Sequence, residues 1–541
     1  MNIGDLSRFF AFMAQKKHTW LGGNAQKNKL LPYFLIFQLA FILFFLLQNQ
    51  LTFADPDSFY HAKMAVLMKD GIVADFPWLQ YTVLRENYAD HHLLYHALLV
   101  PFVWVFPPLL GTKVATVLFA SMAVTVFYWF LRKMRVYYPF LYTAILIVSA
   151  SFVFRINLAK AQSLALAAFF ISFYLIDRKK YALLFVVSFL YVWLYGGWPL
   201  LILLALVYAA VDFFKAAKLK RTPPFFFYAK EHLILLTQKN AKLMAVVISG
   251  IAVGLIANPY FPQNLFFYWH QIVQIAVINY KSIIGVGGEW YPYNPFELIA
   301  SASIAFVVGI LGLTFFALNY KNSDKRTVAF FILFAGFFVL TLKSRRNVEY
   351  LIPIMLAFSG MSLSRFSETI NSKGFYKEVV EFFRGQRLLL LGACVPLLVL
   401  PYVVVRDYLG VRKSYSEGIP FTKLQKSSEW LKANTRAGAI VFHSDWDEFP
   451  VLFYNNSHNY YIVGLDPTFM YDYNQDLYWK WKNATIGEEK AFLHSIIKKD
   501  FRADYVFVST DRHKAFENTL ENNFYFEEVY VDSESKIYKV L

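Results

Sequence analysis

Long apolar segments separated by short polar turns make up most of the chain as far as residue 407. Most of them approach the roughly 17 to 25 residues that an α-helix needs to cross the hydrocarbon core of a bilayer. The segments predicted to span a membrane are 31–50, 112–132, 137–154, 158–177, 180–195, 197–214, 241–258, 297–319, 327–343, 347–365 and 387–407. Because this count of eleven is odd, the two ends of the chain are expected on opposite sides of the membrane.

Basic segments set the predicted orientation of these helices. No small-residue cleavage site follows the first span, so it is predicted to be an uncleaved signal anchor with a cytoplasmic N-terminus, preceded by Lys16, Lys17, Lys27 and Lys29. The other basic segments then fall on the cytosolic side, as the positive-inside rule requires: 132–135, 178–180, 215–242, 321–326 and 373–387. The chain after residue 408 is predicted to be extracytoplasmic, in a bacterial or archaeal cell membrane.

Two long external loops are predicted between the spans. The apolar stretch 93–110 is interrupted by three prolines, and counting it as a span would place the basic segment 132–135 outside. It is therefore interpreted as an interfacial or re-entrant helix that completes a first external loop over residues 51–111. The second external loop covers 258–296 and is rich in tyrosine and tryptophan, which favour the membrane interface.

The pattern changes near residue 411, where charged residues become frequent. Short β-like runs at 439–442, 460–463 and 505–509 alternate with helical patterns at 421–434 and 488–499. We therefore predict a transmembrane domain over residues 1–410 and an extracytoplasmic α/β domain over residues 411–541.

Composition agrees with this organisation. The chain is 57% hydrophobic and 17% charged, values typical of a polytopic membrane protein. Its net charge of +16 resides largely in the turns between spans, so nucleic acid is not an expected partner. The single cysteine, Cys394, lies in the last apolar segment, which excludes a disulfide within the chain.

Unusual acidic and histidine residues occupy the first external loop. Asp57, Asp90 and His92 together offer the oxygen and imidazole ligands that suit a divalent cation such as Mg²⁺ or Mn²⁺. The residues alone leave a second interpretation open, in which turn-forming Asp residues and a surface histidine pair simply form a solvated loop.

Further charged residues are predicted on the same side of the membrane. Lys160, Arg345 and Arg346 would suit an anionic phosphate headgroup beside a metal ion. The arginines would equally suit snorkelling to lipid headgroups. Glu289 lies after two glycines in the second loop, and Asp445, Trp446 and Asp447 follow a predicted strand, where each group is also compatible with an ordinary turn.

Five motifs in order resemble the catalytic subunit of oligosaccharyltransferase, over most of the chain. The segment from Asp57 to Lys63 resembles that family's first Asp motif, and Gly288-Glu289 resembles the Glu of its external-loop motif. The segment from Arg346 to Pro353 resembles the Arg that contacts lipid-linked phosphates. The other two motifs are Trp193 to Trp198, similar to a Trp-Gly-Gly-Tyr segment, and Asp445 to Phe449, similar to the Trp-Trp-Asp-Tyr-Gly signature.

The resemblance implies a polytopic α-helical membrane protein of the GT-C glycosyltransferase type with a C-terminal extracytoplasmic α/β domain. It implies transfer of a sugar or oligosaccharide from a polyprenyl phosphate or pyrophosphate donor, with a divalent cation (Mn²⁺ or Mg²⁺) as cofactor. Asp57 and Glu289 would be catalytic, Asp57 would bind the metal, and Arg346, helped by Arg345 and Lys160, would hold the donor phosphate. Acceptor binding would fall to Trp446, Asp447 and Asp445.

The chain also departs from the family pattern. A second carboxylate motif follows the third span in the family, whereas the corresponding turn here runs from Arg155 to Ser163 and contains no acid. Asp90 and His92 are assigned to the metal on ligand chemistry alone, as a replacement for that motif. The altered residues at 445 and 448–449 leave the acceptor open between protein asparagine, a protein hydroxyl, a lipid and a glycan.

Two functions of other classes are also compatible with a membrane protein of this kind. A transporter or flippase for lipid-linked sugars would place ionisable residues at mid-membrane depth, and the predicted spans are nearly free of them. A receptor or scaffold would not depend on Asp57 at all. Membrane lipids are expected partners in every case.

Overall fold

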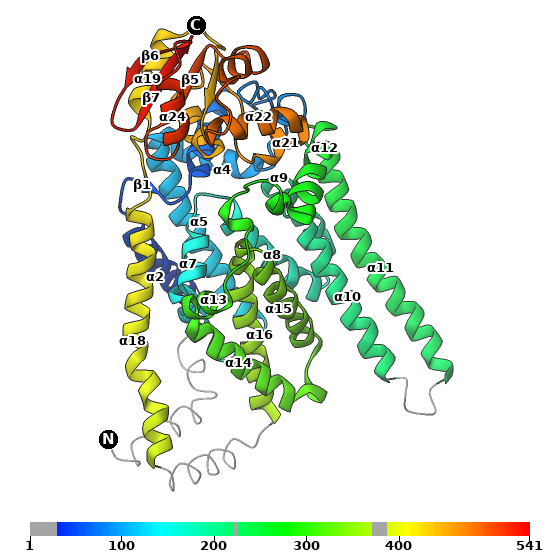
Figure 1. Cartoon of the computed structure of the whole chain (residues 1–541). Coiled ribbons are helices and arrows are strands. Elements are labelled where there is room, and N and C mark those ends of the chain that lie inside the picture. Colours follow the sequence, from blue (N-terminus) through cyan, green and yellow to red (C-terminus); the bar gives the residue numbers. More distant parts are fainter. Residues whose placement is uncertain (1–29, 220–225, 370–386) are drawn as a thin grey trace.

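The computed structural model describes residues 30–219, 226–369 and 387–541. A helical region carries a mixed α/β region at one end, and the long helix α18 (Arg387–Ser416) leads from the first to the second (Figure 1). The lysines at positions 16, 17, 27 and 29 and most of the segment 373–387 lie outside the described residues. The side chain of Cys394 also lies outside them.

Helices occupy all eleven of the predicted spans. They are α2 (Leu31–Leu47), α5 (Pro108–Lys133), α6 (Pro139–Val148), α7 (Ala150–Ile156), α8 (Gln162–Asp177), α9 (Tyr181–Leu194), α10 (Pro199–Leu219), α11 (Phe226–Ile256), α13 (Pro295–Ser301), α14 (Ser303–Leu318), α15 (Lys325–Lys343), α16 (Val348–Thr369) and α18. In two places a predicted span is a bent pair: α6 and α7 meet at 78°, and α13 and α14 meet at 99°.

Length and hydropathy support a membrane protein. Among the described residues, three helices are long and apolar enough to cross a bilayer, namely α5, the Thr237–Ile256 part of α11, and α15. The number becomes five if each bent pair counts as one span. Four further apolar helices of 10–17 residues are shorter than that limit. The count of eleven spans and the sidedness of the chain stay predictions.

The two predicted external loops contain helices of their own. The first holds α3 (Asp57–Leu67), a short η1 (Val83–Arg85) and α4 (Leu93–Val105). The second holds α12 (Gln263–Trp269), the π-helix η2 (His270–Ile278), η3 (Tyr280–Ser282) and η4 (Gly288–Trp290). Helix α3 was not predicted. Pro56 precedes it, and the Asp57 amide donates to Asp55 Oδ1 at 2.9 Å, so the acidic motif itself forms the N-terminal turn.

The C-terminal region contains a five-stranded mixed sheet in the order β4-β3-β5-β7-β6. Its first three strands are parallel, and β7 is antiparallel to both of its neighbours. The strands are β3 (Ile440–His443), β4 (Tyr460–Tyr461), β5 (Tyr505–Ser509), β6 (Phe526–Val531) and β7 (Ser535–Val540). The associated helices are η7 (Trp446–Glu448), α19 (Gln425–Asn434), α20 (Phe449–Asn455), α21 (Thr468–Tyr473), α22 (Gln475–Thr485), α23 (Leu493–Ser495), η8 (Ile496–Asp500) and α24 (Lys514–Glu521).

The strand predicted at 505–509 is confirmed, and those at 439–442 and 460–463 overlap β3 and β4. The last two strands were missed. On β6 an interior run of exposed glutamates breaks the expected alternation, because only one end of this edge strand is buried.

The sheet is joined to the helical region through the first loop. Strand β1 (Thr52–Phe53) pairs antiparallel with β2 (Ile419–Pro420). These two strands form a small sheet of their own. At the β4 edge of the five-stranded sheet, Leu79 forms a parallel bridge with Tyr461, beside amide-to-carbonyl bonds from Tyr461 to Trp78 (2.8 Å) and from Gln80 to Tyr461 (2.9 Å). The first loop therefore extends the sheet beyond β4.

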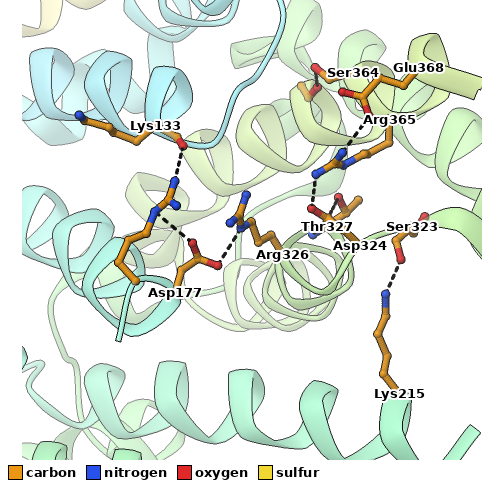
Figure 2. A network of polar contacts seen from close by, with 12 residues as sticks. Lys133, Asp177, Lys215, Ser323, Asp324, Arg326, Thr327, Ser364, Arg365 and Glu368 are labelled. Carbon is orange, nitrogen blue, oxygen red and sulfur yellow. Dashed lines mark hydrogen bonds and ion pairs between the residues drawn. The ribbon is translucent and has the colours of Figure 1, made fainter. Parts of the chain in front are cut away.

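A polar network ties several helices together where α8 and α16 end and α15 begins (Figure 2). Asp177, at the end of α8, accepts from Arg326 of α15 at 2.7 Å. Asp324 caps α15 by accepting from the backbone and side chain of Thr327, and it also forms an ion pair with Arg365 of α16 at 2.7 Å. The network therefore holds α8, α15 and α16 in register.

We expect Asp324→Ala to lower the free energy of unfolding by about 1–2 kcal/mol, since an N-cap contributes about 1 kcal/mol and a partly exposed ion pair at most about 1 kcal/mol. Thermal unfolding in detergent micelles would measure the change. Glu368→Ala is the matched control, because Glu368 pairs with the same Arg365 on the exposed surface and caps no helix. Equal losses for the two variants would contradict the assignment of a capping role.

Candidate functional site

A cavity of about 1610 Å³ lies where the helical region meets the C-terminal sheet. Its walls come from the start of α3, the turn between α7 and α8, the end of α9, η4, the short helix η6 (Arg345–Asn347) and the connection after β3. Nine of the predicted site residues line it: Asp57, His92, Lys160, Glu289, Arg345, Arg346, Asp445, Trp446 and Asp447. Asp90 does not line the cavity.

Two carboxylates of the cavity wall share one lysine. Lys160 Nζ is 2.7 Å from Asp57 Oδ2 and 2.9 Å from Asp55 Oδ2. The lysine is buried, whereas the Asp57 side chain is 34% exposed and thus open to the cavity. Burial raises the pKa of Asp55 to about 6 despite the nearby ammonium group of Lys160. A role was predicted only for Asp57, whereas in the structure both carboxylates contact the same ammonium group.

A second group of charges surrounds Glu289. Its carboxylate accepts from Arg155 Nη1 at 2.7 Å and lies 3.7 Å from Arg346 Nη1. Arg155 also pairs with the buried Glu349 at 3.1 Å. Burial acts to raise the pKa of Glu289, but Arg346, Lys160 and Arg155 outweigh it and hold that pKa well below its usual range. Glu289 is therefore an anion that links two arginines.

The two adjacent arginines of η6 have different surroundings. The Arg345 side chain donates to the carbonyl of Pro292 at 3.2 Å, and its amide donates to the carbonyl of Tyr291 at 3.1 Å. Arg345 thus fastens the loop that carries Glu289. Arg346 instead lies 4.3 Å from the centre of the Trp290 ring and reaches the Tyr195 hydroxyl at 3.4 Å. Of the two, Arg346 is the one placed to meet an anion in the cavity.

Asp90 belongs to a buried histidine cluster. It accepts from His96 Nδ1 at 2.6 Å and from the His92 amide at 2.9 Å, and His96 Nε2 is 2.7 Å from His61 Nδ1. Burial, together with the neighbouring His96, lowers the pKa of His92 to about 3, so this ring is neutral at ordinary pH.

The residues predicted to hold a divalent cation are not arranged to do so. Asp90 is turned into the histidine cluster, and the Asp57 carboxylate is in contact with Lys160. Across residues 30–219, 226–369 and 387–541, no three His, Cys, Asp or Glu side chains are grouped so that they could hold a metal ion. The donor set of Asp57, Asp90 and His92 therefore does not fit the expected divalent cation.

The wall contributed by the C-terminal region begins directly after β3. Asp445 accepts from the Asp447 amide at 3.2 Å while Glu448 accepts from the Asp445 amide at 3.1 Å, which forms a capping box around η7. Asp445 and Glu448 therefore hold the turn, and Trp446 and Asp447 are presented to the cavity. Burial and the neighbouring Asp445, Asp57 and Asp55 raise the pKa of Asp447 from its usual 3.8 to about 7.

This shift predicts a pH-dependent stability. Asp447 binds its proton more tightly in the folded chain, so its own contribution to stability is fully present below about pH 4 and is lost as the pH rises through about 7. Asp447→Asn, which mimics the protonated form, should stabilise the protein at pH 8 by about 1–2 kcal/mol after allowance for partial exposure, and should have little effect near pH 4. Thermal unfolding at both pH values would measure this.

Asp445→Asn is the control with the opposite sign. Burial acts to raise the pKa of Asp445, but the nearby His513 ring, 3.6 Å away, and the hydrogen bond from the Asp447 amide lower it below its usual value. The ionised Asp445 carboxylate thus stabilises the fold at pH values above its unfolded-state pKa. This stabilisation is lost as the pH falls. The Asn variant should be the less stable one at pH 8, and a gain in stability there would contradict the assignment.

Some residues of the cavity were not singled out in the sequence. Glu349 lies inside a predicted span. The only feature of the sequence that could have marked it as a site residue is that a carboxylate is unusual in an apolar helix. Asp466 lines the cavity from a loop after β4, accepts from the Thr468 amide at 2.8 Å, and has its pKa raised by burial to about 6. No local pattern distinguishes Asp466 from a turn residue, so only the fold reveals it.

No protein-family model and no curated protein matches this sequence. Solved structures do match. The oligosaccharyltransferase of Archaeoglobus fulgidus in the apo form is 13% identical, with a TM-score of 0.60 over 89% of this chain and 70% of that chain. The same organism's AglB, in complex with an inhibitory peptide and a dolichol-phosphate, is 12% identical, with a TM-score of 0.61 over 94% and 74%.

The third comparison lies outside the oligosaccharyltransferases. The arabinofuranosyltransferase AftD from Mycobacteria is 12% identical, with a TM-score of 0.56 over 94% of this chain and 40% of that chain. The chain has a GT-C glycosyltransferase fold. Within this GT-C fold, the cavity is lined by residues from all five motifs that carried the family resemblance, with Tyr195 contributed by the Trp193–Trp198 motif.

Proposed function

We propose that this chain is a membrane glycosyltransferase that takes a sugar or oligosaccharide from a polyprenyl phosphate or pyrophosphate donor and transfers it to an acceptor on the extracytoplasmic side. The observation that carries the proposal is the arrangement of one cavity. A partly exposed carboxylate, Asp57, lies on one wall, and a cation over an aromatic ring, Arg346, lies on another.

The donor phosphate is assigned to Arg346. A guanidinium group forms paired hydrogen bonds with phosphate oxygens, and its charge stabilises the negative charge that develops on the leaving group. Glu289 positions Arg346, since its carboxylate lies between Arg346 and Arg155. Leu200, Leu203, Ile272 and Ile275 line another part of the cavity and offer apolar contacts to the lipid of the donor.

Asp57 is assigned to the acceptor. The acceptor N–H or O–H gives its proton to the Asp57 carboxylate, and its electron pair forms the new bond to the anomeric carbon. The bond from that carbon to the phosphate oxygen breaks, and its electron pair leaves with the phosphate. Lys160 contacts Asp57 Oδ2, so Oδ1 is the atom that we assign to the proton.

The acceptor itself is assigned to the wall formed by Trp446 and Asp447. Trp446 closely approaches Gly287 of the loop that carries Glu289, where an added Cβ would lie 3.7 Å from its ring. A peptide, glycan or lipid headgroup would pass between this wall and Asp57. We propose a protein acceptor first, on the similarity of the 445–449 segment, with a hydroxyl, lipid or glycan acceptor as the alternative.

The test is a transfer assay with purified protein in detergent. Polyprenyl phosphate and pyrophosphate donors carrying a labelled sugar, and nucleotide sugars as the comparison, would each be offered with peptides containing asparagine sequons or serine and threonine. We expect label transfer from a lipid-linked donor only. Transfer from nucleotide sugars alone would refute the proposal. So would a protein that, after reconstitution into vesicles, transports the lipid-linked donor across the membrane but transfers no sugar.

A further inference from the structure

Lys160 occupies the position between two carboxylates that a divalent ion would otherwise bridge. It lies on the turn between α7 and α8, the turn in which the sequence contains no acid. Its ammonium group makes both of its ion pairs at hydrogen-bond distance, 2.7 Å to Asp57 and 2.9 Å to Asp55. Only 7% of the Lys160 side chain is exposed, so both ion pairs are buried contacts rather than contacts of a mobile surface lysine.

The backbone on both sides of these contacts is tied together. Gln48, at the end of α2, donates to the carbonyl of Asn157 at 2.9 Å and to its side chain at 3.2 Å. Asn157 in turn donates to the carbonyl of Val153 on α7 at 3.0 Å. The Lys160 amide also donates to the carbonyl of Leu158 at 2.8 Å. The lysine is therefore fixed relative to the segment that leads into the acidic motif.

A lysine in this position competes directly with a metal. Mg²⁺ binds carboxylate oxygens at about 2.0–2.1 Å. An ion bridging the two Oδ2 atoms would overlap the ammonium nitrogen, which already lies within 2.9 Å of both. The ammonium group also supplies the positive charge that a bridging ion would supply, because it reduces the repulsion between the two neighbouring carboxylates.

We propose that the Lys160 ammonium is the cation that bridges Asp55 and Asp57, and that this chain transfers its sugar without a divalent metal ion. The proposal rests on the proposed function for its second half. Its first half, the exclusion of a metal from the acid pair, is independent of any transfer activity. In this role Lys160 is a positioning residue that orients the Asp57 carboxylate towards the acceptor.

The decisive measurement is Mn²⁺ binding to the purified full chain, followed by the loss of the electron paramagnetic resonance signal of free Mn²⁺. The wild type is expected to bind no Mn²⁺ at the acid pair. Lys160→Asp places a third carboxylate beside Asp55 and Asp57, and we expect at least a tenfold gain in Mn²⁺ affinity. Lys160→Gln, which retains the size of the side chain, removes the competing charge and should give a smaller gain even if the Asp variant fails to fold.

Lys113→Met is the matched control. Lys113 is also a buried lysine, but its ammonium donates to the backbone carbonyl of Gln50 and lies over the rings of Phe53 and Phe421. No gain in Mn²⁺ affinity is expected from it. Transfer by the wild type should also be unchanged after treatment with a chelator.

Two results would overturn the proposal. One is Mn²⁺ binding by the wild type that Asp57→Asn abolishes. The other is a folded Lys160 variant, Asp or Gln, with no gain in affinity, because the lysine would then not be what excludes the ion. An absence of transfer under all conditions would instead refute the proposed function, and the Mn²⁺ measurements would still decide the role of Lys160.

Discussion

Replacement of Asp57 by Asn is expected to lower kcat for sugar transfer by about 10²- to 10⁴-fold, the usual contribution of a general base. The variant keeps the size of the side chain and a hydrogen-bonding oxygen for Lys160, so the fold should be retained. It cannot accept the proton of the acceptor. Initial rates with a saturating lipid-linked donor, together with thermal unfolding to confirm the fold, would measure the effect.

The matched control is Asp55→Asn. Asp55 makes an equivalent contact with Lys160, yet its remaining oxygen, Oδ1, already accepts from the Asp57 amide at 2.9 Å. An Asn side chain can retain that bond. We therefore expect a loss of less than about tenfold from it. A larger loss for Asp55→Asn than for Asp57→Asn would transfer the catalytic role to Asp55.

Replacement of Arg346 by Ala is the second change with a large expected effect, a loss of about 10²- to 10³-fold in kcat. The guanidinium group stabilises charge that grows on the phosphate in the transition state, so the loss should fall on kcat more than on KM. Arg346→Lys should recover only part of the rate, since an ammonium group cannot form the paired contacts of a guanidinium group. Steady-state rates over a range of donor concentrations would separate the two parameters.

The adjacent arginine provides the control for Arg346. Arg345 also lines the cavity, but its side chain donates to the carbonyl of Pro292 and lies over the ring of Tyr293, so it is engaged by the loop that carries Glu289. Arg345→Ala should change kcat by less than about tenfold and should affect the stability of the loop instead. Equal losses for Arg345 and Arg346 would mean that the effect is structural, and would remove the argument for phosphate binding.

The helices of the GT-C fold could be predicted from the sequence because each apolar segment has a local signal. The same is true of Arg346 and of Trp446 and Asp447, which belong to short motifs and do line the cavity. Helix α3 was missed because its buried face includes polar residues such as Ser58 and His61, which hide the apolar periodicity.

Pairings across the chain could not be predicted. Lys160 meets Asp57 from a turn about a hundred residues away, and Arg155 meets Glu349 from a different helix. The misplaced ligand was Asp90. Asp90 was assigned to a metal because His92 lies close to it in sequence. In the structure the Asp90 carboxylate instead contacts His96, which is buried on the first turn of α4. A ligand type read from the sequence therefore does not establish what the side chain contacts.

The pairing of β1 with β2 has a consequence for how such proteins can be recombined. The two-residue strand Thr52–Phe53 ends two residues before Asp55 and pairs with Ile419–Pro420 at the start of the C-terminal region, although more than 360 residues separate the two strands in sequence. The acidic motif and the C-terminal region are thus not interchangeable modules. In a chimera that takes its C-terminal region from a relative, residues 51–57 would have to come from the same relative. The reason is that the strand beside the two acids pairs with a strand of the C-terminal region.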